Sequence, residues 1–340
     1  MSYTVDDPPM GIVTRAELED SLAELAREVR DPREGILGPD SVAWQLGGDL
    51  AVFLGGGRAA LLQLAHPMVA YAVEQHSRTR ADVVGRFQRT FRNVFAMVFG
   101  ELDDAFIAAR RVHQIHTRIR GEIPQQIAGW RAGTPYHAND ADALRWVHAT
   151  LVDTTLAVRE RLDGALPAAL KDTYIVEMNR FAALFGIPRE LRPTSWSAHD
   201  AYMQRMLASD QLAVAPCARE MAMFLMGRAG PHEPGAGSPA DLHDRHAQPP
   251  LGRFAEALTA AMLPAHLARD FGLQRTRLSA IGVRLGLAAF APMYRRLPGR
   301  FVAIPARATA SRRIQGLPPT RLAAWTERQL FGLSRQVTGV

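Results

Sequence analysis

The chain has 340 residues, 47% hydrophobic and 22% charged, a globular balance with enough length for a large buried core. Its only cysteine is Cys217, which excludes an intramolecular disulfide and any multi-cysteine metal site. The net charge of +6 has its source near the C-terminus, where residues 273–340 hold 12 arginines and one acidic residue, Glu327. We expect the Cys217 thiol to be buried and inert, because it lies in an apolar stretch.

The first residues, MSYTVDDPPMG, lack the basic and apolar segments of a secretory signal. No apolar run reaches the roughly 18 residues that a membrane-spanning helix needs. We therefore expect a cytoplasmic protein. Its basic C-terminal region is either a solvated face, a patch that contacts the inner face of the membrane, or a nucleic-acid patch.

The N-terminal lead-in, residues 1–39, contains one predicted helix at 15–29. Asp40 and Ser41 can cap a second helical segment, whose apolar spacing continues to Leu54. Residues 55–57 are three glycines that follow a helical pattern, so a helix break or a close crossing of two segments is favoured over a phosphate-binding loop. The next helix, 58–76, is apolar all round and therefore buried, and Pro67 should kink or divide it.

Helical periodicity dominates the rest of the chain. Further helices are predicted at 81–99, 103–120, 140–162, 167–185, 197–208, 214–226, 251–263, 276–294 and 320–333. The segment 122–140 resembles a loop, and we find no alternating strand runs and no internal repeat. The fold class is therefore mainly α, a single large helical domain. Its parts are a core at 40–226, a Gly/Pro/His-rich linker at 227–250 and a basic helical region at 251–340 that packs on the core.

Histidines inside helical segments are the first candidates for chemistry. His113 and His116 lie three residues apart on one predicted helix, and Arg120 lies four residues further on the same face. His66 and His148 lie in other apolar helices. Neutral imidazole binds iron, zinc or copper, and a haem needs one such histidine, an apolar pocket and cations for its propionates. A hydrogen-bonded structural role explains each single histidine as well.

A polar stripe on the helix 81–99 is the second candidate. Arg86, Arg89 and Thr90 share one face of a helix that is otherwise rich in Phe and Val. They could line a distal pocket or form the solvent face of an amphipathic helix. His148 and Asp153 are five residues apart, about 140° around the axis, so one helix face cannot present both to one site.

Several other catalytic motifs are missing from the sequence. It has no Glu-x-x-His pair for a di-iron bundle, no HExxH metalloprotease helix, no P-loop and no GxSxG nucleophile elbow.

Four ordered motifs between Val42 and Leu207 carry a family resemblance. They are GGGRAALLQLAHPMVAYAVEQHS, RFQRTFRNVFAMVFG, RVHQIHTRIRG and WVHATLVDT. Together they resemble the bacterial branch of the rubber-oxygenase (latex-clearing protein) and mpaB oxygenase catalytic-domain family. The resemblance implies an all-α domain that encloses a haem b. In the rubber-cleaving members, dioxygen cleaves an isoprenoid carbon–carbon double bond.

The resemblance also implies residue roles. The stretch Arg86-Phe-Gln-Arg89-Thr90 is similar to the family's distal Arg-x-x-Lys-Thr, but Arg89 replaces the lysine, and a guanidinium is bulkier and never neutral. His116-Thr-Arg-Ile-Arg120 is similar to the proximal His-x-x-Val-Arg. Glu74 is the nearest counterpart of a family glutamate, although its spacing differs.

His66, His113, His148 and Asp153 look typical of the bacterial branch, which assigns them no role. On this basis we predict a haem b-dependent oxygenase that acts on dioxygen and a lipophilic, unsaturated or isoprenoid small molecule. His116 would ligate the iron, with Arg120, His113, His148 and His66 as further cofactor-binding candidates. Arg86, Arg89 and Thr90 would orient dioxygen, and Glu74 would act as a base. Cleavage of a rubber polymer is not expected without a secretion signal.

Three alternatives stay open from the sequence. The first is a haem-binding protein without oxygenase turnover, either peroxidase-like or a sensor. The second is a basic helical protein that binds nucleic acid through its C-terminal arginines. The third is a porphyrin-free metal site built from His113, His116 and His148.

Overall fold

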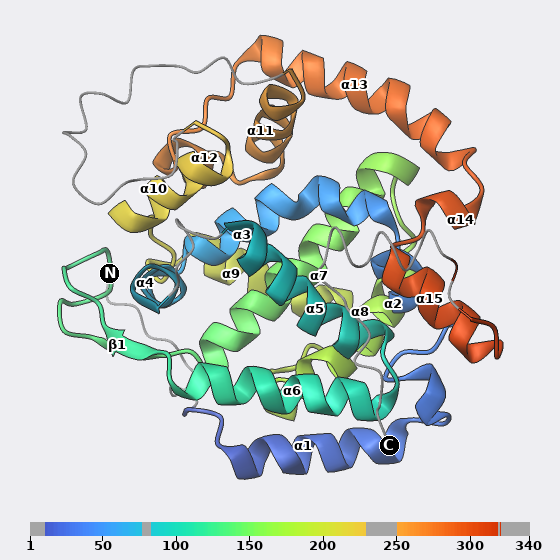
Figure 1. The fold of residues 1–340 in the computed structure, drawn as a ribbon. Coiled ribbons are helices and arrows are strands. Elements are labelled where there is room, and N and C mark those ends of the chain that lie inside the picture. Colours follow the sequence, from blue (N-terminus) through green and yellow to red (C-terminus); the bar gives the residue numbers. More distant parts are fainter. Residues whose placement is uncertain (1–10, 77–82, 229–249, 319, 321–340) are drawn as a thin grey trace.

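Helices make up most of the computed structural model, which describes residues 11–76, 83–228, 250–318 and 320, with the side chains of 83–88 outside the description (Figure 1). This confirms the mainly α fold class. The α-helices are α1 (Arg15–Glu28), α2 (Val42–Gly47), α3 (Gly56–Leu64), α4 (Pro67–His76), α5 (Val83–Phe99), α6 (Leu102–Thr117), α7 (Ala141–Asp163), α8 (Ala168–Ala183), α9 (Trp196–Ala208), α10 (Pro216–Leu225), α11 (Pro250–Met262), α12 (Ala265–Asp270), α13 (Arg277–Arg295), α14 (Gly299–Val302) and α15 (Pro305–Ile314). Three short 3₁₀ helices are η1 (Pro32–Glu34), η2 (Leu50–Gly55) and η3 (Arg189–Leu191).

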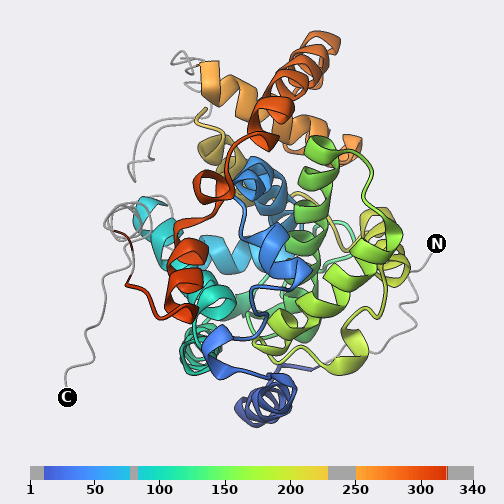
Figure 2. The ribbon, with the colours of Figure 1, turned by 90° about the vertical axis from the view of Figure 1, so that its right-hand side faces the viewer.

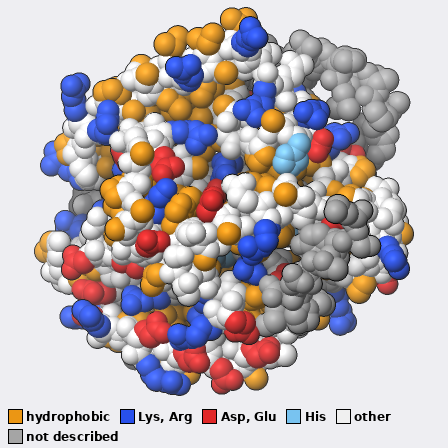
Figure 3. All heavy atoms as spheres, turned by 180° about the vertical axis from the view of Figure 1, so that it is seen from behind, with side chains coloured by type: hydrophobic (Ala, Val, Ile, Leu, Met, Phe, Trp, Pro, Cys, Tyr) orange, Lys and Arg blue, Asp and Glu red, His pale blue; other side chains and the backbone are white. Residues whose placement is uncertain are grey.

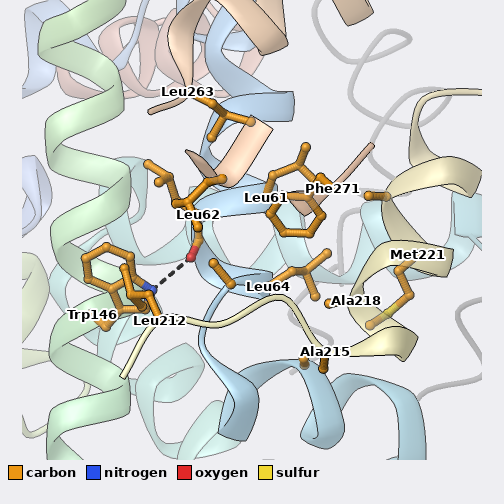
Figure 4. Close-up of a cluster of buried hydrophobic side chains, with 14 of the residues drawn as sticks. Leu61, Leu62, Leu64, Trp146, Leu212, Ala215, Ala218, Met221, Leu263 and Phe271 are labelled. Atoms are coloured by element: carbon orange, nitrogen blue, oxygen red, sulfur yellow. Dashed lines mark hydrogen bonds between the residues drawn. The ribbon is translucent and has the colours of Figure 1, made fainter. Parts of the chain in front are cut away.

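The long helix α7 passes through the middle of the molecule and packs against α3, α8 and η2 (Figures 1 and 2). Its Trp146 is fully buried and donates its indole N–H to the Leu62 carbonyl oxygen of α3 at 2.9 Å (Figure 4). Leu61 and Leu62 are also fully buried. The prediction that the helix beginning at residue 58 is apolar and buried is therefore confirmed.

The glycine triplet marks a close crossing of segments, as the sequence suggested. A Cβ at Gly55 would lie 2.3 Å from Thr154 Cγ2 of α7, and one at Gly57 would lie 2.2 Å from Thr259 Oγ1 of α11. Neither distance is tolerated by a real side chain, so only glycine lets α3 approach both helices. Pro67 then divides the predicted helix 58–76 into α3 and α4.

A short antiparallel hairpin corrects the prediction of a loop at 122–140. Strands β1 (Arg120–Glu122) and β2 (Pro135–His137) pair with Gly121 opposite Tyr136. The buried Tyr136 donates its hydroxyl to Gln75 Oε1 of α4 at 2.6 Å, which fixes the hairpin to the helical body. Strands of three residues are too short to show an alternating pattern in the sequence.

The C-terminal helices pack on the core. α11 contacts α3 and η2, and α13 contacts α11 and α7 through a cluster that includes Val283 and Ala291. α12, α14 and α15 were not predicted. α12 has six residues and α14 has four, which are too few to show helical periodicity. Most of the predicted linker 227–250, and the predicted helix 320–333 beyond Thr320, lie outside the described residues.

We searched the described helices for membrane spans, and none combines the length and the apolar character that crossing a bilayer requires.

Candidate functional site

Helices α5 and α6 form a helical hairpin that carries several of the predicted site residues. The chain reverses at Gly100, and the two helices pack against each other. A Cβ at Gly100 would lie 2.3 Å from the Ala96 carbonyl oxygen, so the tight turn requires glycine. Because the chain reverses there, the start of α5 and the end of α6 lie on the side of the hairpin away from this turn. Arg86 lies near the start of α5, Arg89 and Thr90 lie close to its middle, and His116 lies at the end of α6.

His116 is half-buried in the last turn of α6. Its Nδ1 is shielded from solvent and has no hydrogen-bond partner among the described residues. Burial, together with nearby His113 and His137, lowers the pKa of His116 to about 4, although contacts with Asn139 and Ala138 oppose the shift. The imidazole is therefore neutral at pH 7, the form that ligates a metal.

Asn139 fixes the end of α6 next to His116. Its side-chain amide donates to the His113 carbonyl oxygen at 3.2 Å and to Thr117 Oγ1 at 3.3 Å. His113 Nε2 lies 2.9 Å from the Val13 carbonyl oxygen, so its ring is held against the segment that precedes α1. His137 arrives from β2 and its Nδ1 accepts from the Asn139 backbone N–H at 3.0 Å. The sequence analysis missed His137 and Asn139, because the hairpin that places them was not predicted.

Arg120 does not share a face of α6 with His116, which corrects the sequence prediction. The helix ends at Thr117, where Arg118 and Ile119 close a tighter turn on the carbonyls of Ile115 and His116. Arg120 is instead exposed in β1, and its carbonyl oxygen lies 2.9 Å from His76 Nε2. The pairing of β1 with β2 ends the helix three residues earlier than the predicted boundary at Arg120.

The polar stripe of α5 lies on the exposed side of that helix. Arg89 and Thr90 are exposed, whereas Phe91, Val94 and Phe95 pack into the core between α5 and α6. The backbone of Arg86 belongs to α5, but its side chain lies outside the described residues. The amphipathic character predicted for this helix is therefore present in the fold.

Glu74 lies on the side of α4 that faces α10. Its charge helps raise the pKa of Tyr71 and of Cys217, although burial is the larger cause for both. The pKa of the buried Cys217 rises to about 11, so the thiol is protonated at pH 7, as expected for an inert cysteine.

His66 occupies the junction between α3 and α4 and packs its ring 5.3 Å from that of Trp130. Burial lowers the pKa of His66 to about 4, and its Nδ1 is shielded and has no partner among the described residues. Unlike His116, the whole ring is buried.

A second group of polar residues lies inside the helical body, around α7 and α9. Arg58 is buried and bonds Asp153 Oδ2 at 2.6 Å, Thr154 Oγ1 at 2.7 Å and the Met262 carbonyl oxygen at 2.9 Å. On the other side, His199 Nε2 of α9 lies 3.6 Å from Asp153 Oδ1. Burial alone would raise the pKa of Asp153, but the contact with His199 and the charge of Arg58 outweigh it and keep the pKa below its usual value.

His148 belongs to this second group. Its Nε2 lies 3.0 Å from the Met178 carbonyl oxygen, and burial lowers its pKa to about 4. His148 and His199, together with Arg145 and Tyr202, line a pocket of about 10 Å³, room for roughly one water molecule. His148 and Asp153 do point to different sides of α7, but His199 lies next to both. No pattern in the sequence indicated this partner from another helix.

No group of three or more His, Cys, Asp or Glu side chains within the described ranges is placed to hold a metal ion. The porphyrin-free site of His113, His116 and His148 is therefore not formed.

Comparison with known proteins gives one match. Residues 44–296 match the sequence profile described as "ER-bound oxygenase mpaB/B'/Rubber oxygenase, catalytic domain". No curated protein and no solved structure matches the chain. The matched range covers well over half of the 340 residues and includes both groups of polar residues described above. The chain therefore belongs to the mpaB and rubber-oxygenase catalytic-domain family, a family of oxygenases.

Proposed function

We propose that this protein is a haem b-dependent oxygenase that acts on a lipophilic, unsaturated small molecule of the isoprenoid type. Membership of an oxygenase family supports the reaction class. The observation that carries the haem assignment is His116, a neutral and half-buried imidazole whose shielded Nδ1 has no partner among the described residues.

The residues around His116 fit a haem. A proximal ligand must be neutral and held in one orientation, and the Asn139 contacts hold the last turn of α6 in place. Arg120 in β1 is exposed and offers a cation for a propionate. A bound haem would supply redox-active iron for dioxygen chemistry.

His116 is a better ligand candidate than the other histidines. The pocket beside His148 has a volume of about 10 Å³, which admits one water molecule but no porphyrin. His113 and His66 are buried, against Val13 and Trp130 respectively. Among the four candidate histidines, all of which lie in the described part of the chain, His116 is the one whose side chain is half-buried rather than buried, at the end of its helix.

The chain's own residues would then bind and orient the reactants. Arg89 offers a fixed positive charge and several N–H donors, and Thr90 offers a hydroxyl donor one residue further along α5. Arg86 joins them as the third residue of the stripe. Because a guanidinium does not accept a proton near pH 7, proton removal from an allylic carbon needs another group, and we assign it to the Glu74 carboxylate.

The first test is an absorption spectrum of the purified protein and of three matched variants, His116→Ala, His113→Ala and His148→Ala. We expect a haem Soret band in the unmodified protein, its loss in His116→Ala, and its retention in the other two. The ligand assignment is wrong if His116→Ala keeps the band while another variant loses it. Without haem in any preparation, the haem assignment fails entirely.

Dioxygen consumption with an unsaturated isoprenoid separates oxygenase turnover from haem binding alone. Arg89→Gln should lower this consumption at least tenfold while it preserves the Soret band, because it removes the charge without touching the iron ligand. A haem protein that consumes no dioxygen with any such substrate would instead support a peroxidase-like or sensing role.

A further inference from the structure

Helix α13 has an apolar outer face that no described residue covers. Leu278 is 82% exposed, Leu285 66%, Met293 57% and Ile281 51%. Successive residues turn about 100° around a helix axis, so these four side chains fall on one side. The opposite side contains Val283 and Leu287 and packs on α11 and α7. α13 is therefore apolar both inside and outside, a pattern that in soluble proteins belongs to buried helices.

Further large apolar side chains are exposed in the segment after α13 and in α11, which packs against α13. Leu297 is 42% exposed and Phe301 57%, and Leu251 of the adjacent α11 is 78% exposed. In Figure 3, which shows the back of the molecule, hydrophobic side chains gather with Lys and Arg groups along the top. Figures 1 and 2 both place α13 at the top of the molecule, with α1 and α6 at the opposite end. The exposed apolar side chains of α13 therefore lie at one end of the fold.

An arginine stripe flanks this surface. Arg277, Arg284 and Arg295 fall within about 20° of one another around the α13 axis. All three are exposed, and none has a hydrogen bond or ion pair to another described residue. The arginines of α15 differ, because Arg307 and Arg313 donate to backbone carbonyls of the core.

The chain segment that contains this arginine stripe carries charged side chains of one sign. Residues 273–318 include nine arginines and no Asp or Glu. The nearest acid of α11, Glu256, is engaged by Arg228. A face that exposes large aliphatic side chains beside arginines with no partner in the described part of the chain is complementary to a surface that offers phosphates above an apolar layer.

We propose that α13 docks on an anionic lipid surface, with Leu278, Ile281, Leu285 and Met293 inserted at the boundary between headgroups and acyl chains. Arg277, Arg284 and Arg295 bind lipid phosphates, and the helix lies parallel to the membrane. Nucleic acid is a poorer match, because a phosphate backbone gives no partner for four exposed aliphatic side chains. The proposal does not depend on the oxygenase reaction, and its readout is binding alone.

The test is flotation of the full-length protein with vesicles of phosphatidylcholine, with and without phosphatidylglycerol. We expect binding to the anionic vesicles, weakened by salt, and little binding to phosphatidylcholine alone. Arg284→Gln/Arg295→Gln should lower the affinity roughly thirtyfold, which corresponds to about 1 kcal/mol for each arginine near the surface. Leu278→Ser/Leu285→Ser should lower it at least as much.

A matched control lies at the opposite end of the molecule. Ile107 and Arg111 of α6 are both exposed, so Ile107→Ser/Arg111→Gln changes the same residue types away from α13. Binding equal to that of the unmodified protein is expected for this variant. All three substitution sets fall on exposed side chains, and circular dichroism checks that each variant is folded.

Four outcomes would overturn the proposal. The first is failure to bind anionic vesicles, and the second is equal loss of binding in the α6 control. The third is a dimer, seen by light scattering, that the α13 substitutions convert to a monomer while vesicle binding is absent, which would assign the face to a second copy of the chain. Salt-dependent binding to duplex DNA without vesicle binding would also contradict a lipid partner.

Discussion

Two regions of the molecule bury histidines in different ways. Around α7 and α9, Asp153 lies between Arg58 and His199, and His148 bonds a backbone carbonyl. At the end of α6, His116 keeps one shielded ring nitrogen without a partner among the described residues. Burial lowers the pKa of both His116 and His148 to about 4, so burial alone does not separate them.

The two regions differ in the partners of their histidines and in the space around them. The α7–α9 region contains paired charges and room for about one water, so it stabilises the packing of the helices around it. The α6 end leaves Nδ1 of His116 without a hydrogen-bond partner among the described residues. Substitutions in the first region should therefore change stability, and those in the second should change ligand binding.

The largest effect on stability is expected from Asp153→Ala. It leaves the buried Arg58 without its counter-charge and should lower the free energy of unfolding by about 3–5 kcal/mol. Chemical denaturation measures the change, and the Soret band of the remaining folded protein should persist. Glu19→Ala removes an acid that pairs with Arg15 and Arg110 at a more exposed site, where a cost below about 1 kcal/mol is expected. Equal changes in the free energy of unfolding for the two variants would show that burial does not make the Arg58–Asp153 pair more important for stability than an exposed pair.

A smaller effect concerns pH. The pKa of His148 is about 4 in the folded protein, where burial acts together with His199 and Arg192, and its ordinary value is about 6.5. Between these values the unfolded chain binds the extra proton, so His148 should lower the free energy of unfolding by about 1.4 kcal/mol for each pH unit of acidification. Asp140 acts in the opposite direction, because burial raises its folded pKa to about 6 and it gains a proton in the folded state first.

Denaturation of the unmodified protein and of His148→Phe, repeated between pH 4 and 7, measures the slope of the free energy of unfolding against pH. The variant should be less sensitive to acid, whatever its stability at pH 7. Identical slopes in the two proteins would mean that His148 is protonated in the folded state as readily as in the unfolded chain.

The smallest effect on stability is expected from His116→Phe without bound haem. The substitution removes an unpartnered nitrogen and keeps a ring of similar size, so the free energy of unfolding should change by less than about 1 kcal/mol. Haem binding should be lost in the same variant. A large loss of stability would place His116 with the structural histidines and remove the contrast between the two regions.

The helical part of this protein follows from its sequence. Apolar spacing and the Ser41 cap predicted the positions of most helices to within a few residues, because these signals act within one helical turn. Pro67 divided the apolar segment as expected, since the missing N–H acts wherever the residue lies. The candidate histidines were also visible, but the sequence ranked them only through the family resemblance.

Contacts between distant segments decided the rest. The pairing of β1 with β2 ended α6 at Thr117, moved Arg120 off the helix and brought His137 and Asn139 to His116. His199 reached Asp153 from a helix 46 residues further along the chain. The outer face of α13 has the composition of a buried helix. The spacing of apolar residues in its sequence is the same whether or not a neighbouring element covers that face. The sequence alone determined which segments are helical and apolar. Only the tertiary structure decided which apolar faces are covered and which histidines find partners, because both depend on residues that are far apart in the chain.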